Sequence, residues 1–130
     1  MVIDTSALIA IELQEPERRP FGRAILLSDR RLASAASAVE FVAVYAGRGR
    51  SDDPMVVFDR LRRDLGIEVV PVDDLQWRAA AEALVRYGKG RHPARLNLGD
   101  SFAYALAKVR GEPLLYKGDD FARTDIVAAI

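Results

Sequence analysis

The chain contains no cysteine and only one histidine among its 130 residues. Without cysteine there is no disulfide framework, no thiolate nucleophile and no thiolate metal site. No apolar run approaches the ~20 residues that a membrane-spanning helix needs, and the N-terminus lacks the basic stretch that begins a signal peptide. The 19 basic and 19 acidic side chains balance, so net charge indicates no particular partner. We therefore expect a cytoplasmic protein without membrane contact.

What is present is ordinary for a globular protein: half of the residues are hydrophobic and 29% are charged. The length suits a single domain covering residues 1–130. Alternation of short strands with helices predicts a parallel sheet covered by helices on both faces. The run IEVVPV at 67–72 is the clearest interior strand, and the remaining strands are expected at 2–4, 113–118 and, as a last edge strand, 125–130. Helices are expected at about 5–13, 16–28, 34–46, 54–66, 74–88 and 98–109.

Asp4 is the only ionisable side chain in the stretch MVIDTSALIAI that opens the chain. Removing a lone carboxylate from water costs several kcal/mol, so its presence there needs a reason. In open α/β sheets functional sites lie beyond the carboxyl ends of the strands, and Asp4 follows the expected first strand. The alternative is that Asp4 only caps the helix that comes next.

Other acids stand in similarly apolar surroundings. Glu40 and Asp100 are the only acids in two apolar helical stretches, and the adjacent Asp119 and Asp120 follow an expected strand. Taken singly, they can be read as a half-exposed glutamate, a first-turn residue and a turn. Carboxylates that share one crevice, however, repel each other and stay ionised only when a cation lies among them. Oxygen ligands favour Mg²⁺ or Mn²⁺, which activate water on phosphates, so the pattern indicates phosphodiester hydrolysis.

The segment RYGKGRHPAR at 86–95 is basic and contains no acid. It leads directly into the helix that carries Asp100, and a basic loop beside an acidic metal site is what cleavage of a polyanion requires. Tyr87 is expected to stack on bases of single-stranded RNA together with the histidine of this segment. A solubilising surface loop is the alternative. The residues expected to bind RNA are Arg86, Lys89, Arg91, His92 and Arg95.

Four stretches in this order resemble the PIN-domain family, and specifically VapC-type toxin ribonucleases of type II toxin–antitoxin pairs. They are VIDTSALIAI, SAVEFVAV, YGKGRHPARLNLGDSFAYALAK and PLLYKGDDFARTDI. The resemblance covers essentially the whole chain. It implies a three-layer α/β/α sandwich and an Mg²⁺- or Mn²⁺-dependent endoribonuclease. It also implies a homodimer that a cognate VapB-type antitoxin inhibits within a larger hetero-oligomer.

The resemblance also assigns the site. The catalytic acids would be Asp4, Glu40, Asp100 and one aspartate of GDDF, with Asp4 and Asp100 as direct metal ligands. We favour Asp119 as the fourth acid because it lies nearer the strand end, and adjacent residues leaving a strand point in opposite directions. Asp120 would then orient the turn. Two further residues, Ser6 and Asn97, would orient carboxylates by hydrogen bonds, although Asn97 can also be read as a helix N-cap.

Two other classes of protein compete with a nuclease. One is a receiver-like or phosphatase-like α/β domain with an acidic Mg²⁺ pocket, which Lys117 weakly allows but which the missing second acid of an Asp-x-Asp motif disfavours. The other is a non-catalytic module whose carboxylates bind the arginines of a partner. Metal-dependent RNA cleavage separates the nuclease from both.

Overall fold

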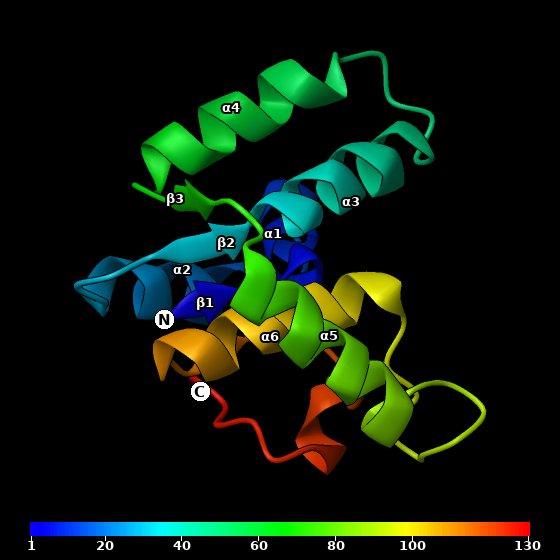
Figure 1. Ribbon diagram of the computed structural model, residues 1–130. Coiled ribbons are helices and arrows are strands. Elements are labelled where there is room, and N and C mark those ends of the chain that lie inside the picture. The colour runs from blue at the N-terminus through cyan, green and yellow to red at the C-terminus, as the bar shows by residue number, and fades with distance from the viewer.

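The computed structural model describes residues 1–130 and contains one four-stranded sheet (Figure 1). Its strands lie in the order β3-β2-β1-β4, and every neighbouring pair is parallel. Helices cover both faces, so the expected α/β/α sandwich with a short parallel sheet is confirmed. The strands are β1 (Val2–Ile3), β2 (Leu32–Ser34), β3 (Glu68–Val70) and β4 (Leu114–Leu115).

Helices begin where the sequence offers capping side chains. Ser34, Asp53 and Asp73 each accept a hydrogen bond from a backbone N–H in the first turn of the next helix. Gly111, at φ 63°, ends the sixth helix in the left-handed conformation that glycine adopts without strain. The helices are α1 (Thr5–Glu12), α2 (Arg18–Leu27), α3 (Ala35–Ala46), α4 (Pro54–Asp64), α5 (Asp74–Tyr87) and α6 (Leu98–Arg110), followed by the 3₁₀ turn η1 (Phe121–Arg123).

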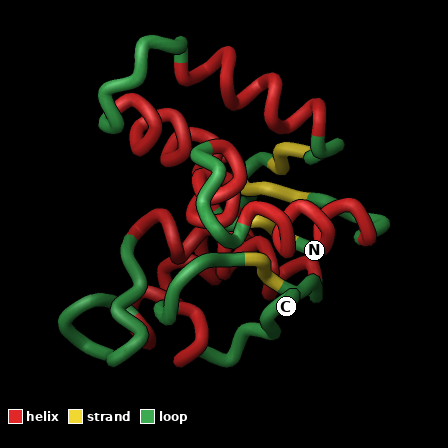
Figure 2. Tube along the Cα trace, turned by 180° about the vertical axis from the view of Figure 1, so that it is seen from behind, coloured by secondary structure: helices red, strands yellow, loops and turns green.

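Successive side chains of each strand enter two different hydrophobic cores, because they point to opposite faces of the sheet. Ile3 packs in the core formed with α1 to α4, whereas Val2 packs in the core formed with α5 and α6. Leu115 and Leu114 divide in the same way. Figure 2 shows the strands lying in the middle of the molecule between the helices. Strands buried on both faces must be apolar throughout, which explains why β1 and β4 carry no charge.

The structure differs from the expected strands in three places. Residues 32–34 form β2, which the sequence pattern did not reveal because three residues are too few to show alternation. The 67–72 run forms β3, an edge strand rather than an interior one. Residues 125–130 make only one bridge, between Leu114 and Ala128, instead of a regular edge strand.

The carboxyl edge of the sheet gathers the segments that matter for function. The chain leaves β1 into α1 and β2 into α3, and β4 lies on the side of β1 opposite β2. This reversal of strand order opens a crevice beyond β1, the position at which open α/β folds bind ligands. None of the helices combines the length and the apolar character needed to cross a lipid bilayer.

Candidate active site

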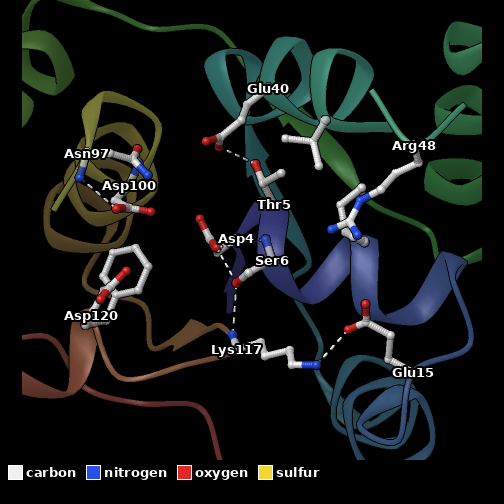
Figure 3. Close-up of a pocket in the computed structure, with 13 residues that line it drawn as sticks. Asp4, Thr5, Ser6, Glu15, Glu40, Arg48, Asn97, Asp100, Lys117 and Asp120 are labelled. Carbon is white, nitrogen blue, oxygen red and sulfur yellow. Dashed lines mark hydrogen bonds and ion pairs between the residues drawn. The ribbon is translucent and has the colours of Figure 1, made fainter. Parts of the chain in front are cut away.

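A pocket of about 430 Å³ opens at this carboxyl edge (Figure 3). Side chains from α1, α3, α6 and the segment after β4 meet there although they are far apart in the sequence. Most of the lining is polar. The residues that line it are Asp4, Thr5, Ser6, Ile9, Glu15, Glu40, Val44, Arg48, Asn97, Asp100, Lys117, Asp120 and Phe121.

Asp4 lies at the floor of the pocket and is only 3% exposed. Its Oδ2 accepts hydrogen bonds from the Ser6 backbone N–H at 2.9 Å and from the Ser6 hydroxyl at 2.5 Å. The Ser6 Oγ in turn accepts the Lys117 backbone N–H at 2.9 Å, which ties the carboxylate to the segment after β4. Asp4 is therefore the N-cap of α1, as the alternative interpretation predicts. Its Oδ1, however, is buried with no hydrogen-bond partner, which capping does not explain.

Asp100 stands in the first turn of α6 and forms a capping box with Asn97. The Asn97 Oδ1 accepts the Asp100 backbone N–H at 3.0 Å, and the Asp100 Oδ2 accepts the Asn97 backbone N–H at 2.8 Å. Asn97 is thus a helix N-cap and also fixes the orientation of the Asp100 carboxylate. The other oxygen, Asp100 Oδ1, is left for the pocket.

Glu40 approaches the same pocket from α3. The Thr5 hydroxyl donates a hydrogen bond to Glu40 Oε2 at 2.7 Å. The carboxylate rests against the first turn of α6 at Gly99, where a Cβ atom would overlap it. Glycine is therefore required at this position for steric reasons, since Gly99 is helical. Thr5 and Gly99 together define where Glu40 lies.

The fourth acid in the pocket is Asp120, not Asp119. Asp120 lines the pocket and its charge raises the pKa of Asp100, whereas Asp119 lies outside on an exposed turn. Our preference for Asp119 assumed strand geometry, but β4 ends at Leu115 and the chain turns at Gly118, with φ 98°. The alternation of a strand no longer applies there, and the turn before η1 directs Asp120 inward.

The acids in the pocket disfavour one another's ionised forms. Burial raises the pKa of Asp4 from 3.8 to about 6, partly opposed by the Ser6 hydrogen bonds and reinforced by the charge of Glu40. Burial likewise raises the pKa of Asp100 to about 7, and the charges of Asp4, Glu40 and Asp120 add to this. A cation among them would relieve both effects.

The donor set fits a hard divalent cation. As the side chains stand, no three acidic or histidine side chains are arranged to hold one ion together. Two carboxylates nevertheless suffice for Mg²⁺, which keeps several of its waters. Asp4 offers a buried oxygen without a partner, and Asp100 offers a neighbouring carboxylate whose ionisation Asp4 opposes.

The expected RNA-binding residues divide into two groups. Backbone hydrogen bonds between Lys89 and Leu96 and between Leu96 and Tyr87 close the base of the 88–96 loop, which projects beside the start of α6 (Figure 1). Lys89, Arg91 and Arg95 are exposed on it and make no ion pair.

The other group points elsewhere. Tyr87 is only 4% exposed, so it cannot stack on a base. Arg86 belongs to α5, lies over the Tyr87 ring and pairs with Asp125 at 3.5 Å. His92 packs edge-on against Tyr87, and its Nδ1 accepts the Ala94 backbone N–H at 3.1 Å. Arg86 and Tyr87 are corrected as structural residues because the apolar face of α5 continues to its last turn.

Several residues of the pocket were not anticipated. Thr5 was read only as a possible helix cap, and Gly99 and Arg48 carry no local sequence signal. Lys117 was considered for a receiver-like site, but its ammonium pairs with Glu15 and Glu17 at 2.7 and 3.0 Å. That pairing removes the support it gave to the receiver-like interpretation.

Comparison with known proteins agrees with this geometry. The family model described as PIN domain matches residues 1–127. Ribonuclease VapC42 of Mycobacterium tuberculosis is 48% identical over 127 residues, which make up 97% of this chain and 96% of the relative. Ribonuclease VapC of Mycolicibacterium smegmatis is 45% identical over 128 residues, 98% of each chain.

A solved structure is also similar. The crystal structure of Mycobacterium tuberculosis VapC20, a Sarcin-Ricin loop cleaving toxin, matches with a TM-score of 0.76 and covers 97% of this chain and 95% of the other. The identity is 18%, so this likeness supports the fold alone.

Proposed function

The chain belongs to the PIN-domain family, within its VapC group, and on that premise we propose that it is a divalent-metal-dependent endoribonuclease that hydrolyses RNA phosphodiester bonds. Relatives that span nearly the whole chain are ribonucleases by name. The single observation that carries the metal dependence is the buried, unpartnered Oδ1 of Asp4 in a pocket with Asp100. The geometry of these two carboxylates suits an ion better than it suits a helix cap.

Asp4 and Asp100 are the residues that would hold the ion. A bound Mg²⁺ or Mn²⁺ would supply a water of lowered pKa and stabilise negative charge on the phosphoryl oxygens. Glu40 and Asp120 would accept hydrogen bonds from that water or hold a second ion. No side-chain nucleophile is required.

The surrounding residues fix these carboxylates in place. Ser6 holds Asp4 through Oδ2 and leaves Oδ1 free, while Asn97 does the same for Asp100. Thr5 holds Glu40. Such hydrogen bonds to the ligands tune the affinity of a metal site. The 88–96 loop would bind RNA phosphates through Lys89, Arg91 and Arg95, with His92 at its edge.

The VapC relationship extends the proposal to partners. We place the chain in a homodimer, inhibited by a cognate VapB-type antitoxin in a larger hetero-oligomer, acting on RNA in the cytoplasm. Co-expression with the neighbouring short reading frame, followed by purification, tests the pairing: a stable complex supports it, and two separately eluting proteins contradict it.

The activity is tested with a fluorescently labelled single-stranded RNA incubated with the wild-type chain in EDTA, Mg²⁺ or Mn²⁺. We expect endonucleolytic products only with an ion present. Equal cleavage in EDTA would show that the acids do not act through a metal. The absence of cleavage under all three conditions, with a range of RNA sequences, would contradict the nuclease assignment.

A further inference from the structure

Arg48 lies just beyond the C-terminal end of α3 and lines the acidic pocket. Figure 3 shows its side chain reaching into the pocket from the side opposite Asn97 and Asp100. It is exposed and makes neither an ion pair nor a side-chain hydrogen bond. A guanidinium beside several carboxylates, yet paired with none, is available for an anion that comes from outside the protein.

The other cation of the pocket is already neutralised. The Lys117 ammonium lies 2.7 Å from Glu15 and 3.0 Å from Glu17. Arg48 is therefore the one cation lining this pocket that has no carboxylate partner. Its charge also stands apart from the basic 88–96 loop, which lies on the α6 side of the pocket next to Asn97.

A polyanion that crosses an acidic pocket needs positive charge on both sides. Guanidinium groups suit phosphates because their planar N–H donors bind two oxygens at once. With the 88–96 loop on one side and Arg48 on the other, a single strand can pass over Asp4 and Asp100 while its phosphates remain paired at both ends.

We propose that Arg48 binds a phosphate of the RNA substrate on the side of the pocket opposite the 88–96 loop. This inference rests on the proposed ribonuclease function and adds the direction in which the strand crosses the site. It assigns to Arg48 substrate binding, and no role in holding the metal.

The chain offers a matched control two residues away. Arg50 has the same charge and lies on the same loop, but its guanidinium lies 5.9 Å from the centre of the Tyr45 ring and does not line the pocket. We would compare Arg48→Ala, Arg48→Lys and Arg50→Ala with wild type. The measurements are kcat and KM for single-stranded RNA cleavage at several salt concentrations, and calorimetric Mn²⁺ binding.

We expect Arg48→Ala to lower kcat/KM by about 10-fold to 100-fold, the range for losing a charge-assisted hydrogen bond. The slope of log kcat/KM against log salt should become shallower by ~0.7, the value for one phosphate contact on a single strand. Arg48→Lys should restore most of the slope but only part of the rate, and Mn²⁺ affinity should not change.

Equal effects of Arg48→Ala and Arg50→Ala would overturn the inference and leave the ribonuclease function standing. A loss of Mn²⁺ affinity in Arg48→Ala would also overturn it, since the residue would then act on the acidic site. A wild-type chain that does not cleave RNA would overturn the proposed function and this inference together.

Discussion

Replacing Asp4 by Asn should stabilise the metal-free protein at neutral pH. Asn caps a helix about as well as Asp, and its side-chain oxygen can keep both hydrogen bonds from Ser6. The substitution removes the buried charge whose pKa rises from 3.8 to about 6. At ~1.4 kcal/mol per pKa unit, that difference corresponds to about 3 kcal/mol of unfolding free energy.

The sign of the pH dependence follows from which state binds the proton. Between pH 4 and 6 the folded wild-type chain holds the Asp4 proton and the unfolded chain does not, so the free energy of unfolding falls as pH rises. The amide that replaces the carboxyl group in Asp4→Asn does not titrate. The advantage of Asp4→Asn should therefore be absent near pH 4 and reach about 2–3 kcal/mol above pH 6.5, or roughly 7–10 °C in Tm for a domain of this length.

The assay is thermal and urea unfolding in EDTA at pH 4.5 and 7.5, with Asp119→Asn as the control that removes an equal charge from an exposed turn outside the pocket. Addition of Mg²⁺ or Mn²⁺ at pH 7.5 should then stabilise the wild type, by ~2.7 kcal/mol at one hundred times its Kd, and leave Asp4→Asn unchanged. If the two proteins unfold alike at both pH values, or the variant is the less stable at pH 7.5, Asp4 is no strained buried charge.

Three further predictions concern the rest of the site. Gly99→Ala should displace the Glu40 carboxylate and reduce kcat at least 10-fold while circular dichroism remains native, because only that side chain must move; wild-type kcat would mean that the position of Glu40 is irrelevant. Asp120→Asn should slow RNA cleavage more than Asp119→Asn does, and the reverse order would restore the assignment based on strand alternation. Neutralising the basic loop should flatten the salt dependence of RNA binding by ~0.7 per contact, whereas neutralising the arginines of α4 serves as a control that should not. The loop variant combines Lys89→Ala, Arg91→Ala and Arg95→Asn, with asparagine chosen for the last position because Arg95 has φ 57°.

The sequence allowed much of the site to be predicted because its acids are conspicuous. Asp4, Glu40 and Asp100 each interrupt an apolar segment, and the rule that α/β sites lie at the carboxyl ends of strands placed them together. The choice between Asp119 and Asp120 failed because it depends on a turn that follows the strand, where no periodicity holds.

Other features depend on contacts between distant segments. Thr5 and Gly99 acquire meaning only when α3 and α6 meet, and Arg48 only when the end of α3 is seen beside the pocket. The same holds for Tyr87, since its position in a basic segment gave no sign that α5 buries it. Three-residue strands such as β2 are fixed by their neighbours in the sheet rather than by their own pattern.

The most direct test of the central claim is the initial rate of single-stranded RNA cleavage by Asp100→Asn and wild type at saturating Mg²⁺, with both proteins shown to be folded. The substitution keeps the capping box that joins residues 97 and 100 but removes the charge that would hold the ion. We predict a loss of at least 100-fold, because substitutions at ligands and their hydrogen-bond partners commonly cost ~10- to 100-fold or more. A rate within a few-fold of wild type would contradict the account of this pocket as a metal-dependent ribonuclease site.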